Sequence, residues 1–374
     1  MMKLKNSRGL FFSETHEPQI SYWANPKMLE LEKESGGKIP SEFLNWKPCA
    51  PDSRSNCPEL HNTMNFLVKM SDPRWRARAK NIYAGRTYSN DDMAESKKNL
   101  NGGMIAISHE YTAVISAYAA MYEKFLSGLD FAKTIPDEGS HSFWSGMRDH
   151  LDESIDEFRS GGILSLKGNP LMAFPDEEIR QGFEGAIFAA EAWTVAHEFS
   201  HHMVRDLSTR TSRRDRDVVD TLRELTANSS VGQEIRDMTA AHRDEINADL
   251  LAGLILSGYF TEERNPIQVP GMICGAVLAL ITIAHFRDEW TSDRSESHPG
   301  CLDRIRILLT VICEYYGKES VYPNDPDRSY MIVRRVAGLL MTFTQWAHGS
   351  VEMDSSLMLV SLTVNSDLFD FSEE

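Results

Sequence analysis

The segment His197-Glu198-Phe199-Ser200-His201 has the residue types and the spacing of a metal site on a helix. Four residues make about one helical turn, so both imidazoles project from one face and can bind one divalent ion. Glu198 lies about 100° around the helix from His197, too far to join a tetrahedral ligand set easily. It can instead reach the metal-bound water and act as a general base. This HExxH pattern predicts a catalytic zinc ion (Zn2+).

The residues around the motif favour a metal over two ordinary histidines. The preceding turns, 189–196, are largely apolar, which predicts a buried helix. Two buried imidazoles and a carboxylate without a metal are costly to desolvate. A second His-Glu pair, His109-Glu110, has Ala113 in place of the second ligand, and we expect it to be structural. His202 follows the motif but points off its face, which indicates a structural or supporting role.

A catalytic zinc ion takes three protein ligands and keeps one open position. Glu245 is the best candidate for the third ligand, because it lies 44 residues after His201 on an expected second helix. Asp249 follows one turn later, where it could accept a hydrogen bond from the other ring nitrogen of a ligand histidine. His242, one turn before Glu245, is a competing ligand. A solvated helix face is the alternative interpretation of Glu245 and Asp249.

An HExxH helix followed by the pattern E-x-x-A-D resembles the gluzincins, the thermolysin-like branch of zinc peptidases. Here the second pattern is Glu245-Ile246-Asn247-Ala248-Asp249. The resemblance implies that Glu245 is the third zinc ligand and that Asp249 supports a ligand histidine. It also implies a zincin-like core for this part of the chain.

A third element, Ser297-His298-Pro299 followed by Arg304, is similar to the S-H-P-x-x-x-x-R signature of HtpX-type and CAAX-prenyl-protease-like peptidases. The resemblance implies that His298 and Arg304 line the active site. His298 could donate a hydrogen bond to an oxyanion, and Arg304 could hold a carboxylate or position the loop. A turn before a helix is the alternative interpretation of His298-Pro299. Those families carry membrane-spanning helices, and this sequence shows no convincing one.

Composition and charge disfavour several classes of function for this protein. The formal net charge is −16, from 39 Lys and Arg against 55 Asp and Glu, which disfavours a nucleic-acid partner. The basic cluster 210–216 is interrupted by aspartate and indicates a solvated loop. Five cysteines without a CxxC pair suggest neither a cysteine zinc site nor a disulfide framework. The N-terminus lacks the apolar stretch of a secretory signal, and the apolar run Met272–Phe286 suits a core helix better than a membrane span. We therefore expect a cytoplasmic protein that acts on a protein or peptide and not on a membrane.

The elements that must position these residues are mainly helices. Apolar periodicity and end signals predict helices over 104–129, 142–158, 175–204, 218–225, 240–256, 272–286, 301–316 and 328–347. The segment Ile163–Phe174 is the best strand or hairpin candidate, because a Gly-Asn-Pro turn separates two short apolar stretches. Residues 1–100 are expected to be irregular, with an exposed loop over 47–60.

The expected fold is mainly α with a small β element, an α+β class. Residues 1–160 form an N-terminal region of unknown role, 161–350 a zincin-like catalytic domain and 351–374 a C-terminal tail. The predicted function is a zinc-dependent metallopeptidase. The alternatives are a non-peptidase zinc hydrolase, such as an amidase, and a zinc-stabilised regulatory or interaction module. The intact Glu198 argues against the last, because a structural site has no use for a general base.

Overall fold

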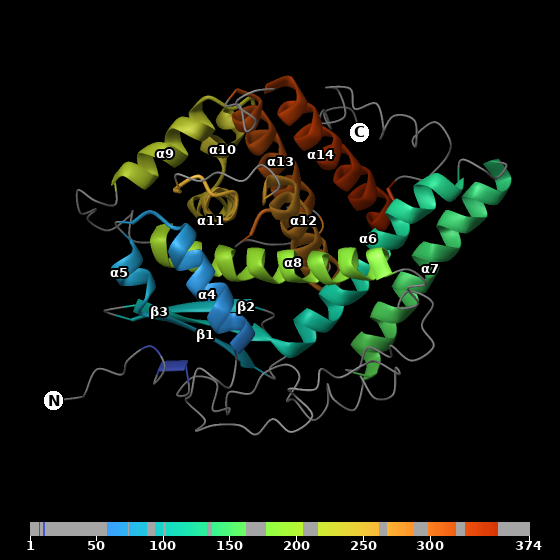
Figure 1. Ribbon diagram of the computed structural model, residues 1–374, viewed down its shortest axis with the longest axis horizontal. Helices are drawn as coiled ribbons and strands as arrows, with labels where there is room; N and C mark the ends of the chain where they lie inside the picture. The colour runs from blue at the N-terminus through green and yellow to red at the C-terminus, as the bar shows by residue number, and fades with distance from the viewer. Residues whose placement is uncertain are drawn as a thin grey trace.

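The computed structural model describes residues 7, 10–11, 58–73, 75–87, 94–99, 102–132, 137–161, 177–204, 216–261, 268–287, 290, 298–318 and 326–350. In these residues the chain is mainly helical and has one small sheet (Figure 1). The α+β class expected from the sequence is therefore confirmed.

The helices are α4 (Pro58–Met70), α5 (Arg76–Ala79), α6 (His109–Ala132), α7 (Asp137–Gly161), α8 (Glu177–Val204), α9 (Arg216–Ala227), α10 (Gly232–Asp237), α11 (Ala240–Leu256), α12 (Gln268–Arg287), α13 (Cys301–Lys318) and α14 (Pro326–His348). From α7 onward, the helices expected from the sequence are present, with ends shifted by a few residues. Both ends of α11 match the expectation. The Thr239 hydroxyl caps its first turn, and Gly258 follows its last turn with a φ of 78°.

The sheet consists of β1 (Ile82–Thr87), β2 (Ala94–Asn99) and β3 (Gly102–Ser108), in the order β1-β3-β2. β3 is parallel to β1 and antiparallel to β2, so Ile105 pairs with Ala84 on one side and with Ser96 on the other. The helix predicted over 104–129 is present from His109 as α6, but its predicted start was wrong, because residues 104–108 belong to β3. β3 is buried along its whole length, so its apolar residues do not alternate with polar ones. The strand ends at Ser108, and α6 begins at the next residue.

The expectation that residues 1–100 are irregular was wrong for the described part, which contains α4, α5, β1 and β2. The expected loop over 47–60 is also wrong at its end, since α4 starts at Pro58 and Leu60 is fully buried. The strand candidate Ile163–Phe174, the tail from Val351 and most of the basic cluster 210–216 lie outside the described residues.

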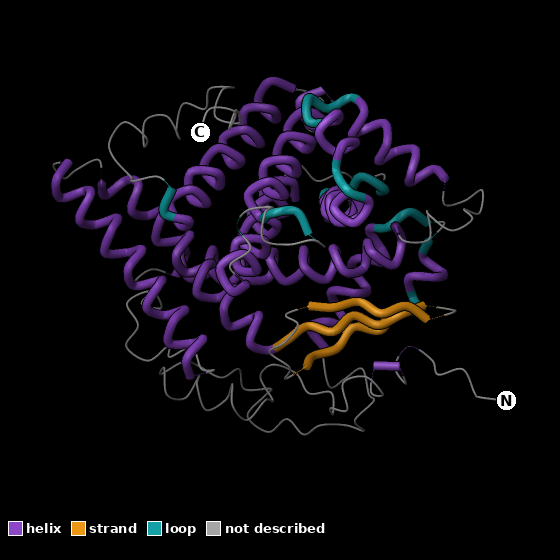
Figure 2. The backbone as a smooth tube through the Cα atoms, turned by 180° about the vertical axis from the view of Figure 1, so that it is seen from behind, coloured by secondary structure: helices purple, strands orange, loops and turns teal. Residues whose placement is uncertain are grey.

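Helix α8 occupies the middle of the molecule, with the sheet on one side and α11 and α12 on the other (Figures 1 and 2). The contact with α12 is very close: a Cβ atom on Gly275 would lie 2.3 Å from the carbonyl oxygen of Ala189. One hydrophobic cluster extends from Leu60 to Ala347 and thus includes residues on both sides of position 160. The division into segments at 160 and 350 stays a prediction.

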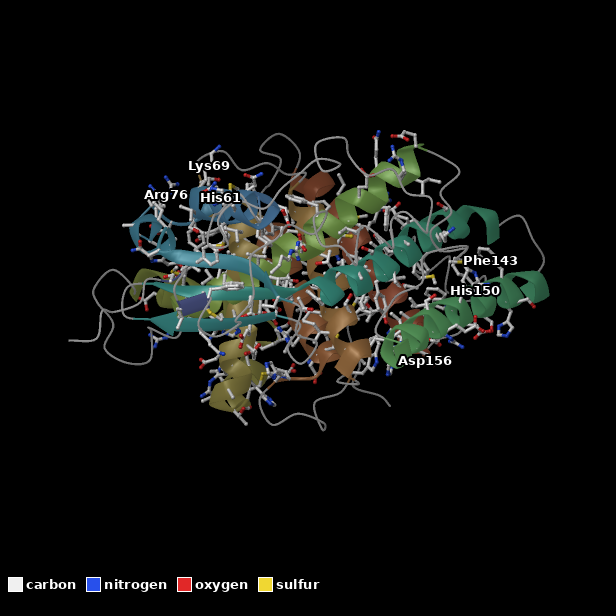
Figure 3. All side chains as sticks on the ribbon, turned by 90° about the horizontal axis from the view of Figure 1, so that it is seen from below. His61, Lys69, Arg76, Phe143, His150 and Asp156 are labelled. Atoms are coloured by element: carbon white, nitrogen blue, oxygen red, sulfur yellow. The ribbon has the colours of Figure 1, made fainter. Side chains whose placement is uncertain are left out.

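Helices α6 and α7 form a hairpin at one end of the molecule (Figures 1 and 3). Trp144 of α7 packs on Phe125 of α6, with ring centroids 5.3 Å apart. His150 and Asp156, labelled in Figure 3, are exposed on α7. This hairpin therefore has an apolar inner face and a polar outer face.

Helix α12 has apolar residues around most of its circumference. This pattern fits its buried position, because it contacts α6, α8, α11, α13 and α14. The apolar run Met272–Phe286 lies within it, as expected for a core helix. Within the described part of the chain, no helix combines the length and the apolarity needed to cross a bilayer.

Candidate metal centre

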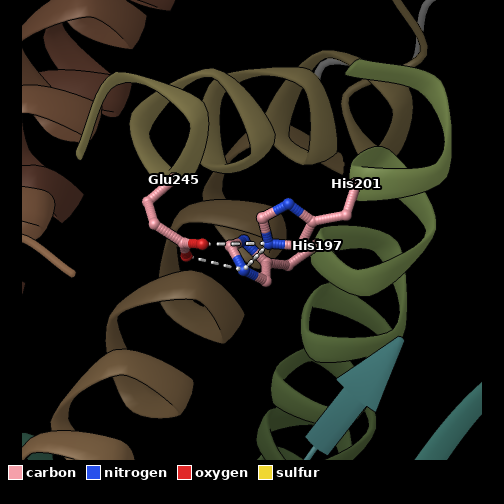
Figure 4. A group of neighbouring side chains, drawn as sticks. All are labelled: His197, His201 and Glu245. Atoms are coloured by element: carbon pink, nitrogen blue, oxygen red, sulfur yellow. Dashed lines mark hydrogen bonds and ion pairs between the residues drawn. The ribbon is translucent and has the colours of Figure 1, made fainter. Parts of the chain in front are cut away.

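His197 and His201 of α8 meet Glu245 of α11 in the interior of the protein (Figure 4). The Nε2 atoms of the two histidines are 3.0 Å apart. One carboxylate oxygen of Glu245 lies 3.4 Å from Nε2 of His197, and the other lies 3.3 Å from Nε2 of His201. All three side chains are buried. The structure thus brings together the three residues that the sequence nominated as ligands.

The spacing of these atoms fits a tetrahedral metal ion. Nitrogen and oxygen ligands lie about 2.0–2.2 Å from zinc, which places two tetrahedral ligands about 3.3–3.6 Å apart. The observed separations of 3.0, 3.4 and 3.3 Å are close to this range. Among the described residues, His197, His201 and Glu245 form the group of potential ligand side chains that could hold a metal ion. Three protein donors leave a fourth position open.

A buried Asp249–Arg304 pair supports the first ligand. Nδ1 of His197 lies 2.8 Å from the carboxylate of Asp249, on the ring side opposite the other ligands. Arg304 donates two hydrogen bonds to Asp249, of 2.9 and 2.8 Å, and lies 3.7 Å from Glu245. One guanidinium therefore contacts the carboxylates of both Asp249 and Glu245. The carboxylate that Arg304 could hold, as the sequence suggested, is Asp249.

Of the remaining predicted residues, His298 lies beside this group. Nε2 of His298 is 3.7 Å from Glu245, and its side chain is 34% exposed, so it lies at the solvent side. Glu198 is buried. The pKa of Tyr111 is raised mainly by burial, and the charge of Glu198 raises it further. His242, the competing ligand, is not in the metal-binding group. The catalytic roles of Glu198 and His298 stay predictions.

His202 packs against the sheet, as its position off the motif face indicated. Its Nε2 lies 3.2 Å from the carbonyl oxygen of Met104. A Cβ atom on Gly103 would lie 2.1 Å from the His202 ring, so only glycine leaves room for this contact. The residue after the motif therefore anchors the end of α8 to β3.

The charges of the site favour a cation. Burial alone raises the pKa of Glu245, but hydrogen bonds from His197 and His201 and the charge of Arg304 hold it well below its usual range. Burial alone lowers the pKa of His197, but the contacts with Asp249 and Glu245 outweigh burial and raise it to about 10. With neutral imidazoles, two carboxylates face one guanidinium and leave a net negative charge. A proton on His197 or a metal ion can balance it.

No family model, curated protein or solved structure matches this chain in the comparisons. The resemblance to the gluzincins therefore rests on the motif residues alone.

The structure adds neighbours that the sequence did not nominate. Trp193 stacks on His197, with ring centroids 5.3 Å apart and planes 24° from parallel. Its place one turn before His197 could have indicated this contact. The hydroxyl of Tyr111 lies 2.9 Å from that of Thr194, also on α8. No sequence signal indicates this second contact, because 83 residues separate the two side chains.

Proposed function

We propose that this chain is a zinc-dependent metallopeptidase with a zincin-like core. The observation that carries the proposal is the convergence of His197, His201 and Glu245 at tetrahedral spacing, with the carboxylate of Glu198 next to the first ligand in the chain. Structural zinc sites are closed by four protein ligands, whereas catalytic sites use three. Three donors and an adjacent carboxylate favour catalysis over a structural role.

The two histidines and Glu245 would hold the ion. When bound, zinc supplies a Lewis acid that polarises a carbonyl group and lowers the pKa of water to about 7. Asp249, 2.8 Å from Nδ1 of His197, would favour a proton on that nitrogen, so that Nε2 would present its lone pair to the site. Arg304 holds Asp249 in this position.

Glu198 is the proposed general base. It takes a proton from the attacking water and returns it to the leaving amine as the peptide bond breaks. His298, whose Nε2 lies 3.7 Å from Glu245, is the proposed donor of a hydrogen bond to the oxyanion that develops on the scissile carbonyl. The proposed substrate is a protein or peptide, since the net charge of −16 disfavours nucleic acid. The proposed location is the cytoplasm.

The test is a Glu198→Gln variant of the full chain, loaded with zinc and incubated with a peptide library whose products are read by mass spectrometry. We expect unchanged metal content and a loss of turnover of about 10²–10⁴-fold, the usual contribution of a general base. Glu184→Gln, an exposed change on the same helix, is the control. Wild-type turnover by Glu198→Gln would contradict the assignment of the base. Hydrolysis of small amides but not of peptides would support an amidase instead.

A further inference from the structure

A buried polar cluster contacts α8 two turns before the metal ligands and has no part in the proposed chemistry. Arg86 of β1 lies 2.6 Å from the carboxylate of Glu191 on α8. The hydroxyl of Thr112, on α6, accepts a hydrogen bond from Arg86 and donates one to Glu191, each of 2.8 Å. Arg86 is 2% exposed and Glu191 is 13% exposed. Three elements thus meet at one residue of the helix that carries the histidines.

We propose that this Arg86–Thr112–Glu191 clamp positions α8 for metal binding. The sheet and α6, from the region before residue 160, would then be a working part of the metal centre. This inference rests on the proposed function, since it assumes that the site binds zinc.

The clamp acts on the face of α8 that carries Glu198, about 100° around the helix from His197. Glu191 lies seven residues before Glu198, almost two full turns, so both lie on the same side of α8. Thr194 lies between them, and its hydroxyl contacts Tyr111, the neighbour of Thr112. Consecutive residues of α6 therefore contact consecutive turns of α8 on the way to the motif.

Directional contacts add to the apolar packing of α8, which buries Trp193 and Phe199 completely. At its crossing with α12, Gly275 meets the backbone at Ala189, so the two helices lie in close contact. Two of the three ligand atoms are on α8 and the third is on α11, so a rotation of α8 changes both distances to Glu245. Hydrogen bonds and ion pairs depend on direction and fix that rotation.

The test compares three variants of the full chain. Thr112→Val keeps the shape but removes the bridging hydroxyl, whereas Thr112→Ser keeps the hydroxyl. Thr344→Val is the matched control, because this buried hydroxyl donates to Leu340 within α14. Zinc affinity is measured by chelator competition, the geometry of the site by the visible spectrum of the cobalt-loaded protein, and stability by thermal unfolding.

We expect Thr112→Val to bind zinc about tenfold more weakly, as for other residues that orient metal ligands, and to change the cobalt spectrum. Thr112→Ser is expected to stay within about twofold of wild type. Thr344→Val should lose stability but neither affinity nor spectrum, which separates positioning from general stability.

If Thr112→Val binds zinc with wild-type affinity and spectrum, the clamp has no positioning role. The double variant Arg86→Met/Glu191→Met gives a second test should Thr112→Val not fold, since apolar residues often replace a buried ion pair without loss of folding. A folded double variant with wild-type zinc affinity would also overturn the inference. A wild-type chain that binds neither ion would contradict the proposed function itself.

Discussion

His197 is the residue at which protons and metal compete. In the metal-free site its pKa is raised to about 10, so at neutral pH metal binding must displace a proton. The apparent zinc affinity is therefore expected to rise with pH, by about tenfold per unit between about pH 6 and 8. Chelator competition across this range measures the slope. An affinity independent of pH would mean that His197 is neutral before the metal binds.

Asp249 connects the charge of Arg304 to the ligand His197. Asp249→Asn keeps the shape but removes the nearer charge partner of buried Arg304 and leaves only Glu245, 3.7 Å away, at a cost of up to about 3–5 kcal/mol in the free energy of unfolding. We also expect zinc affinity to fall about 10–100-fold, because the amide orients His197 less firmly. Adding Arg304→Met should restore stability but not affinity. Chemical denaturation and chelator competition measure the two effects, and recovery of both would show that Asp249 acts on stability alone.

At the scale of elements, the contact between α8 and α12 depends on one glycine. Gly275→Ala would place a Cβ atom 2.3 Å from the carbonyl oxygen of Ala189, so one helix must move. We expect the free energy of unfolding to fall by about 1–3 kcal/mol, as for other overpacked interiors. Gly271→Ala is the control on the same helix, because a Cβ atom there meets nothing within 4 Å and alanine favours the helix. Urea denaturation measures the free energy of unfolding of both variants. An equal loss in Gly275→Ala and Gly271→Ala would contradict the close contact.

At the scale of the whole molecule, a bound ion would join α8 to α11 across the segment 205–239. Zinc at about 100 times its dissociation constant should stabilise the folded chain by about 2.7 kcal/mol, because only the folded state brings the ligands together. Differential scanning calorimetry with zinc, and again with a chelator, measures this shift in Tm. His201→Ala should abolish the shift. A wild-type Tm that does not respond to zinc would argue against a metal centre.

Much of the candidate site could be predicted from the sequence because its signals are local. The two histidines share a face through helical geometry alone, and the ends of α11 follow from Thr239 and Gly258. Glu245 and Asp249 could be nominated by type and spacing. Their contacts with α8 could not, since the angle between two helices depends on packing along their whole length.

Other features were decided by the tertiary structure. Residues 104–108 form a buried strand that continues into α6, and a short apolar run of this kind fits a helix and a strand equally well until its partners are known. The pairing of Arg304 with Asp249 joins side chains 55 residues apart. Arg86, Thr112 and Glu191 come from three separate elements. The chemistry of these side chains is local, whereas their contacts form only when non-local packing places the elements together.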